Sequence, residues 1–286
     1  MQYSAREYEV LFDQTADTGI SIRPGVKACR TKTIKAGPVL ECEIFPIWAT
    51  QAQASQAKKA KGRTREAQKR LNERNAQKRI TRKINANFGK GDLMITNTYR
   101  DGQQPETEEQ AQRDMQNFAR RLKALRKRKG LDATKYVYIT ERTESKKYGV
   151  RYHHHAIFSG DGLDRDEVEA LWPYGNSNTK RYQTNDRHLT GFAHYITKKK
   201  ATQERITKRR WSASKNLEEP KTTVADHKIS VRKMQRIAAQ IEDEARAIFE
   251  KAYPGYILVE APVIRWSEYC AGVYIYATMI KASEAA

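Results

Sequence analysis

Residues 135–158, with the sequence KYVYITERTESKKYGVRYHHHAIF, decide the fold of the central part of this chain. Residues 136–140 are all β-branched or aromatic, which is typical of a strand. The next stretch, 142–149, is polar and charged and ends in glycine, so it predicts the loop of a hairpin. Residues 150–158 predict the returning strand, and together the two strands indicate an antiparallel hairpin.

The returning strand carries three consecutive histidines. Side chains alternate across a strand, so His153 and His155 share one face while His154 points to the other. Glu141 closes the first strand, and the length of the loop lets it lie across from the histidines. Two imidazoles and a carboxylate on one sheet face are the donors of an open divalent-metal site. A His-x-His pair on a strand also occurs without a metal, and Glu141 alone would be an ordinary surface carboxylate.

A helix is expected about 40 residues later, in HLTGFAHYITKKK at 188–200. One face of this helix forms an apolar stripe that would dock on the sheet, consisting of Leu189, Phe192, Ala193 and Ile196. Tyr195, Lys198 and Lys199 fall together beside this stripe, because residues three and four apart are helix neighbours. A tyrosine with two lysines at the edge of a docked helix makes the neighbouring metal site more informative. His188 and His194 are not expected to be ligands.

Three stretches together resemble the His-hydrophobe-His (HUH) endonucleases. This superfamily contains the rolling-circle replication initiators of plasmids and phages, together with relaxases and single-tyrosine transposases. The resemblance covers residues 91–200. LMITNTY at 93–99 is similar to the first-strand motif, and YITK at 195–198 is similar to the tyrosine-x-x-lysine motif. RYHHHAIF at 151–158 is similar to the metal motif, with His154 where a hydrophobic residue is usual.

The resemblance implies a metal-dependent endonuclease that nicks and rejoins DNA. Tyr195 would attack a phosphate and form a covalent intermediate, and Lys198 or Lys199 would help the phenol to lose its proton. The three metal-binding candidates would hold Mn²⁺ or Mg²⁺. The expected partner is single-stranded or hairpin origin DNA, with a host helicase and polymerase as further partners. No P-loop of the GxxxxGK[ST] type is present, so no helicase motor is built in.

The charge of the chain agrees with a nucleic-acid partner. The formal net charge is +20 and the isoelectric point is about 9.8. Such an excess attracts polyanions. No apolar run reaches transmembrane length and no signal peptide opens the chain, which excludes a membrane protein and favours the cytoplasm of a bacterial host. The three cysteines (Cys29, Cys42 and Cys270) are sparse and lack metal-type spacing, so free thiols are expected.

Four regions are expected. Residues 1–50 form a small β-rich segment, and residues 51–90 a basic amphipathic helix. Residues 91–200 form the endonuclease domain, and residues 201–286 a basic linker, a helix and C-terminal strands. The helix within 51–90 has apolar residues at a spacing of about four, and its other face is predicted to bind DNA phosphates through Lys69, Arg70, Arg74, Lys78, Arg79 and Arg82.

The expected order of elements is α+β. Strands are predicted at 8–12, 39–45, 93–99, 136–140, 150–158, 180–183, 256–259 and 272–280, and helices at 105–130, near 164–172, at 188–200 and at 231–251. Strands so close together with helices between them predict an antiparallel sheet with helices on one face. The ferredoxin-like palm that the resemblance implies is compatible with this order. Two roles stay open for the tail, which either covers the catalytic sheet or grips DNA.

Three functions remain in competition. The first is a rolling-circle replication initiator. The second, a conjugative relaxase or transposase, keeps the chemistry and changes the biology. The third is a non-catalytic nucleic-acid-binding protein, in which His153 and His155 belong to a structural zinc site.

Overall fold

The computed structural model describes residues 26–48, 65–145, 149–183, 188–191, 193, 211–239, 242–267 and 272–285. The side chains of residues 65–71 lie outside this description, as does the strand expected at 8–12. The chain divides into two compact units. Unit 1 draws on residues 1–82, 185–188 and 219–286, and unit 2 on residues 83–184 and 189–218.

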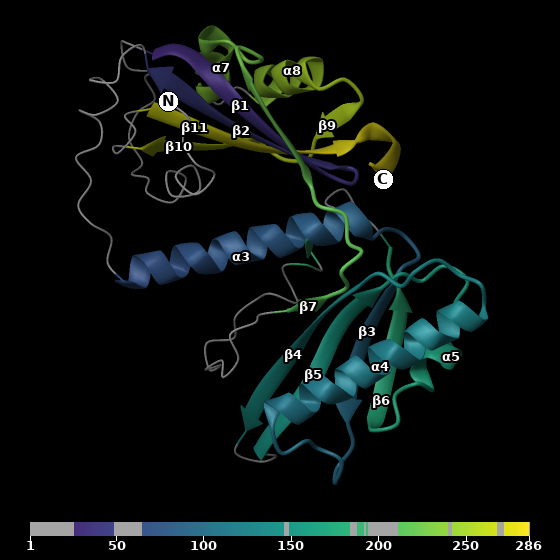
Figure 1. Ribbon diagram of the computed structural model, residues 1–286. Helices are drawn as coiled ribbons and strands as arrows, with labels where there is room; N and C mark the ends of the chain where they lie inside the picture. The colour runs from purple at the N-terminus through teal and green to yellow at the C-terminus, as the bar shows by residue number, and fades with distance from the viewer. Residues whose placement is uncertain are drawn as a thin grey trace. The chain divides into compact units, whose positions relative to one another are not determined.

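Unit 2 is built on a five-stranded antiparallel sheet in the order β6-β3-β5-β4-β7 (Figure 1). The strands are β3 (Leu93–Tyr99), β4 (Tyr136–Ser145), β5 (Gly149–Phe158), β6 (Gly175–Arg181) and β7 (Ser212–Ala213). Since β3 and β4 are each antiparallel to β5, which lies between them, they run parallel to one another. The connection from β3 to β4 is therefore a split β-α-β crossover.

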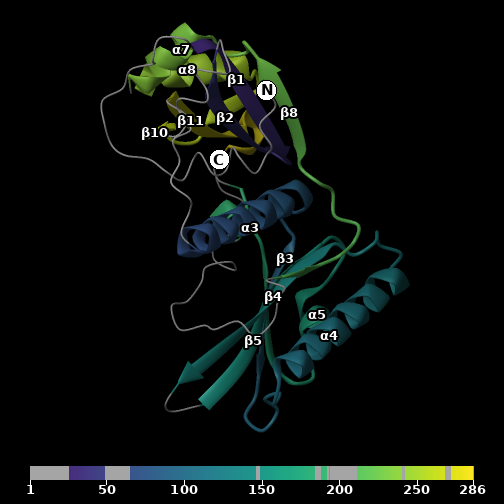
Figure 2. The same cartoon turned by 60° about the vertical axis from the view of Figure 1, so that its left-hand side comes forward.

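Two helices of that unit pack on one face of its sheet, as Figures 1 and 2 show. They are α4 (Glu108–Arg128) and the short α5 (Arg165–Glu169). The core between sheet and helices contains Leu93, Ile95, Ala111, Met115, Phe118, Leu122, Tyr138, Ala156, Phe158, Val168 and Trp172. This confirms the predicted α+β class and the antiparallel sheet.

The limits of α4 follow from its sequence. Thr107 is extended and its side chain accepts a hydrogen bond from the Gln110 amide, an N-cap that starts the helix. Acidic residues occupy the first turn and basic residues the last turn, which suits the helix dipole. Gly130 follows with φ of 67°, a left-handed conformation that favours glycine and ends the helix.

Unit 1 contains a second antiparallel sheet in the order β10-β11-β2-β1-β8, with β9 also paired to β11. Its strands are β1 (Val26–Ala36), β2 (Val39–Trp48), β8 (Lys221–Asp226), β9 (Tyr256–Leu258), β10 (Val263–Ser267) and β11 (Gly272–Lys281). Helices α7 (Val231–Ala238) and α8 (Glu242–Ala252) cover one face and share its core (Figure 2). The tail, for which two roles stayed open, thus pairs with the N-terminal strands in one sheet.

Helix α3 (Arg65–Asn87) is joined to the sheet of unit 1 by buried charges. Arg82 Nη2 lies 2.6 Å from Glu41 Oε2 and 3.3 Å from Glu43 Oε1, and Lys32 Nζ lies 3.2 Å from Glu43 Oε2. Burial opposes ionisation of Glu41, but the Arg82 guanidinium outweighs it and holds the pKa of this carboxyl below its ordinary value. Burying these charges costs less because each has a partner of opposite sign.

Two predicted boundaries are wrong. The loop expected at 142–149 is mostly strand, because the pairing of β4 with β5 continues from Arg142–Tyr152 to Ser145–Gly149. The helix expected at 231–251 is two helices, and Ala239 forms the C-cap of the first. Strands β1, β8 and β10 were not predicted, because their apolar and polar residues do not alternate regularly.

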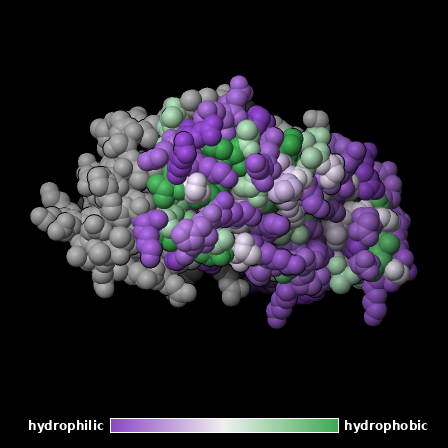
Figure 3. All heavy atoms as spheres, turned by 90° about the horizontal axis from the view of Figure 1, so that it is seen from above, coloured by the Kyte–Doolittle hydropathy of each residue, from purple (hydrophilic) through white to green (hydrophobic). Residues whose placement is uncertain are grey.

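Hydrophilic side chains occupy most of the described surface on the face drawn in Figure 3, and hydrophobic residues form small separate groups there. Within the described ranges, no helix has the length and apolar character needed to cross a membrane.

The buried thiols of unit 1 give the first testable prediction. Cys29 and Cys42 are free, as expected, and burial raises the pKa of each thiol to about 12. Thiolate is the reactive form, so neither should react with a thiol reagent at pH 8 in the folded protein. A Cys270→Ser variant should show no reactive thiol when native and two after unfolding. Stoichiometric labelling of the native variant would contradict the burial of these side chains.

Candidate metal centre and DNA-binding surface

The pairing of β4 with β5 brings three predicted ligands together. Glu141 is the register partner of His153, and Ile139 is the partner of His155. The alternation of side chains therefore puts Glu141, His153 and His155 on the same face of the sheet. This is the face opposite to α4 and α5, since the β5 residues that enter their core are Tyr152, Ala156 and Phe158.

The three side chains converge closely enough to bind one cation. Glu141 Oε2 lies 2.8 Å from His153 Nε2 and 3.6 Å from His155 Nε2. The imidazole centroids are 5.1 Å apart, with the rings nearly perpendicular at 87°. One donor atom from each residue lies within 4.8 Å of the others. Two imidazole nitrogens and one carboxylate are a donor set for a divalent metal, and three ligands leave coordination positions open.

The charge on Glu141 favours this role. Burial of the carboxyl opposes its ionisation, but hydrogen bonds and charge from His153 and His155 outweigh the burial. The pKa of Glu141 is held well below its ordinary value as a result. Glu141 is therefore an anion at neutral pH, the form in which a carboxylate binds a metal.

Thr96 of β3 supports His155 from the neighbouring strand. The two residues are register partners, and Thr96 Oγ1 lies 3.2 Å from His155 Nδ1. A proton on Nδ1 donated to Thr96 leaves the Nε2 lone pair free for a cation. The sequence placed Thr96 in the first-strand motif but gave no sign of this contact, which depends on the register between β3 and β5.

His154 points into the core on the other side of the sheet, as alternation predicted. It is fully buried, with Nε2 3.0 Å from the Tyr99 hydroxyl and Nδ1 3.0 Å from Thr140 Oγ1. Tyr99 in turn donates to Asp114 at 3.2 Å. Burial, together with the charges of the two neighbouring histidines, lowers the pKa of His154 to about 3. His154 is therefore a neutral structural residue and not a member of the metal site.

The predicted catalytic residues Tyr195, Lys198 and Lys199 lie outside the described residues. The start of their helix is anchored in unit 2, where Leu189 and Ala193 are buried. Asn85, near the end of α3, accepts a hydrogen bond from the Leu189 amide at 3.2 Å and donates to Thr190 Oγ1 at 3.0 Å. The sequence gave no indication of this anchor, because Asn85 is more than 100 positions from its partners.

The predicted DNA-binding face of α3 is only partly available. Arg74 and Arg79 are exposed, and Lys78 is half-buried with its Nζ over the Tyr276 ring at 5.6 Å. The side chains of Lys69 and Arg70 are outside the described residues. Arg82 is a correction: its side chain is 11% exposed and is held by Glu41 and Glu43, so it does not lie on the solvent face. A one-sign charge run in the sequence could not reveal these two partners on β2.

A comparison with known families links this geometry to a function. Residues 92–200 match the model of the replication-associated protein ORF2 family. This is a family of rolling-circle replication initiators. The match includes strands β3 to β6, and with them the site formed by Glu141, His153 and His155. It also includes the segment that carries Tyr195. No curated protein and no solved structure matches the chain.

Removing either histidine should greatly weaken metal binding. We expect His153→Ala and His155→Ala to lower the affinity for Mn²⁺ by more than about 100-fold, because even an outer partner of a ligand costs 10–100-fold. Calorimetric titration of the apoprotein measures this effect. His227→Asn is the matched control, since His227 is exposed with φ of 69° and asparagine tolerates that conformation. Unchanged affinity in both alanine variants would rule out this site.

His154 should make the fold sensitive to acid. Its pKa is about 3 in the folded protein, against an ordinary value of 6.5, so the unfolded chain binds the extra proton between these values. The free energy of unfolding should therefore fall as pH drops below 6.5, by at most about 1.4 kcal/mol per pH unit from this residue. Urea unfolding at several pH values should show a shallower dependence for His154→Leu. Equal slopes would contradict a neutral buried imidazole.

Proposed function

We propose that this protein is a rolling-circle replication initiator of the HUH superfamily that nicks and rejoins single-stranded DNA at an origin. The observation that carries the proposal is the convergence of Glu141, His153 and His155 on one sheet face, inside the segment similar to replication-associated proteins. Residues 91–200 are the proposed catalytic domain. The site of action would be the bacterial cytoplasm, where a host helicase and polymerase continue from the nick.

The proposed nucleophile is Tyr195. Its phenol oxygen forms a bond to the scissile phosphorus while the bond from phosphorus to the 3′ oxygen breaks, so the 5′ phosphate stays on the protein. The departing 3′ oxygen gains a proton and is left as a primer end. Lys198 or Lys199 helps Tyr195 to lose its proton, either by charge or by direct transfer, because a phenol is mostly protonated at neutral pH.

A divalent cation held by the three ligands would supply charge stabilisation and in-line alignment of the scissile phosphate. The residues of this chain set the conditions for that role. Glu141 remains ionised because both histidines stabilise the carboxylate. Thr96 fixes the orientation of His155 from the adjacent strand. The ligands bind Mn²⁺ or Mg²⁺ with positions left open for phosphate oxygens.

The covalent intermediate explains how one site can both cut and join. A phosphotyrosine bond retains the energy of the original phosphodiester, so a free 3′ hydroxyl can attack it and release Tyr195. No external energy source is required for this reversal.

The exposed basic residues of α3 are proposed to hold the DNA backbone. Arg74 and Arg79 would contact phosphates, together with Lys69, Arg70 and Lys78. Such contacts position DNA without reading its sequence, and they weaken as salt rises. Arg82 is left out of this set because its ion pairs attach α3 to the sheet of unit 1.

The competing functions have less support. A relaxase or transposase would share the chemistry, but the family similarity is to replication proteins. A structural zinc site is closed and has four ligands, whereas the site here offers three.

The test of the proposal is a covalent trapping experiment. Labelled single-stranded oligonucleotides from the source element, incubated with Mn²⁺, should give a protein–DNA adduct that survives denaturation and is absent with chelator. Tyr195→Phe should abolish the adduct completely. Lys198→Ala and Lys199→Ala should slow its formation, and the one that assists the tyrosine should have the larger effect.

Tyr256→Phe is the matched control, since Tyr256 is a partly exposed residue of unit 1. It should form the adduct at the normal rate. An adduct that persists in Tyr195→Phe would refute the assignment of the nucleophile.

A further inference from the structure

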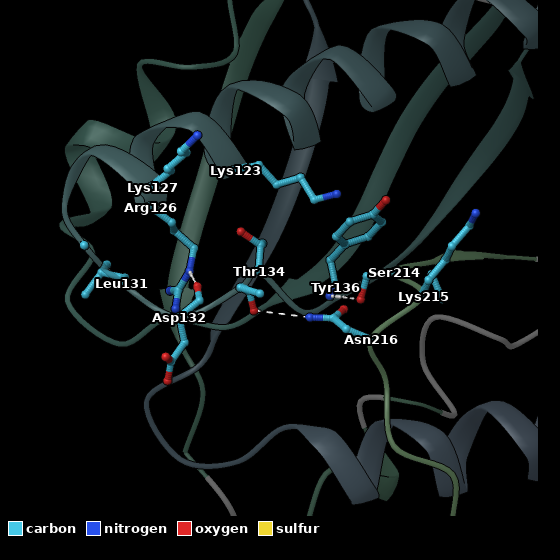
Figure 4. A pocket seen from close by; sticks show the side chains of 13 residues that line it. Lys123, Arg126, Lys127, Leu131, Asp132, Thr134, Tyr136, Ser214, Lys215 and Asn216 are labelled. Carbon is cyan, nitrogen blue, oxygen red and sulfur yellow. Dashed lines mark hydrogen bonds between the residues drawn. The ribbon is translucent and has the colours of Figure 1, made fainter.

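A cavity of about 890 Å³ lies in unit 2, away from the three metal-binding candidates. It is formed by the C-terminal half of α4, the connection to β4, and the residues around β7 (Figure 4). The β7 segment is fixed there by backbone pairing. The Ser214 amide donates to the Tyr136 carbonyl at 2.9 Å, and the Tyr136 amide donates to Ser214 Oγ at 3.0 Å.

The lining of the cavity is basic. Lys123, Lys127 and Lys215 are exposed, and none of their ammonium groups makes an ion pair with any residue in the described ranges. Arg126 also lines it, but its guanidinium is held by Asp161 at 3.0 Å. Asp132 is the single carboxylate among the lining residues. The three lysines therefore leave a local excess of positive charge.

The end of α4 does little to offset that charge. Carbonyl groups at a helix C-terminus normally carry partial negative charge. Here the Lys129 amide donates to the Leu125 carbonyl, and the Leu131 amide to the Arg126 carbonyl. The Gly130 amide donates to the Lys127 carbonyl. Capped carbonyls are poor acceptors for a further ligand, so the lysines dominate the electrostatics of the cavity.

An aromatic ring lies in the middle of this basic lining. Tyr136 is half-buried, and its ring stacks on Phe158 at a centroid distance of 5.2 Å with an interplanar angle of 27°. Lys123 Nζ lies 5.8 Å from the ring centroid. In Figure 4, Lys123 and Lys215 extend on either side of the Tyr136 ring. The core thus supports a rigid flat surface with ammonium groups around it.

The cavity and the metal-binding candidates use different faces of the same sheet. Tyr136 packs against the core under α4, whereas Glu141 lies on the other face. Five residues separate them along β4, a distance of about 17 Å at 3.3 Å per residue. One strand of DNA running past the edge of the sheet can therefore reach both places.

We propose that this cavity is a second binding site for single-stranded DNA, occupied by nucleotides outside the cleavage point. Phosphates bind Lys123, Lys127 and Lys215, and an unstacked base packs on Tyr136. Aromatic stacking combined with a basic groove is the usual way in which proteins hold single strands without sequence preference. The inference takes DNA as the partner from the proposed function, but it requires no cleavage.

The test measures binding without cleavage. A fluorescein-labelled dT20 oligonucleotide is titrated with the full chain in chelator, and anisotropy is recorded at several salt concentrations. The double variant Lys123→Gln/Lys215→Gln should bind about 10-fold more weakly. The slope of log affinity against log salt should fall by about 1.4, since each phosphate contact on a single strand contributes about 0.7.

Lys233→Gln/Lys251→Gln is the matched control, because it removes the same charge from exposed lysines of unit 1. It should change the affinity less than 2-fold. Tyr136→Phe should keep normal binding, while Tyr136→Leu should weaken it. A thiothymidine-substituted strand should crosslink to a peptide containing Tyr136.

Two results would overturn the proposal. One is equal weakening by the two double variants, with no crosslink at Tyr136. The other is full displacement of the strand from the cavity by millimolar dTMP, which would make it a site for a free nucleotide. Failure of the covalent adduct to form in the Tyr195 experiment would leave this binding result unchanged, so the two proposals fail separately.

Discussion

The pairing of β4 with β5 is the constraint on which the site depends. Antiparallel register puts Glu141 opposite His153, and strand alternation puts His155 on the same face two residues later. The same rule sends His154 to the opposite face, where Tyr99 and Thr140 satisfy both of its ring nitrogens. A shift of the register by one residue would exchange the two sets, moving one buried imidazole into solvent and two metal ligands into the core. The hydrogen bonds of His154 therefore help to fix the register that creates the metal-binding face.

The distribution of charge separates structural from functional cations. Arg82 and Arg126 are strongly basic side chains in a strongly basic protein, yet each is buried against a carboxylate. Arg82 attaches α3 to Glu41 and Glu43, and Arg126 attaches the end of α4 to Asp161 and to the backbone of the following loop. Arg74 and Lys123, in contrast, remain exposed. Net charge alone indicates a polyanionic partner, but only the partners of each side chain decide which cations are available to it.

Much of the site could be predicted from the sequence because its determinants are local. Strand alternation depends on neighbouring residues, so the separation of His154 from His153 and His155 was predictable, and a hairpin brings Glu141 close. Helix α4 was predictable from its apolar spacing and its charged ends. The contacts of Thr96 with His155 and of Asn85 with Leu189 were not predictable, because they join elements far apart in the chain. The pairing of the C-terminal β11 with β2 was missed for the same reason, and so was the use of Arg82 in a buried ion pair.

The most direct test of the account is hyperfine spectroscopy of Mn²⁺ bound to the protein labelled with ¹⁵N-histidine. The account predicts couplings from two directly coordinated imidazole nitrogens, one of which disappears in His153→Ala and the other in His155→Ala. His154→Leu should keep both couplings. The absence of imidazole coupling, or the loss of a coupling in His154→Leu, would contradict the claim that strand alternation builds the metal centre.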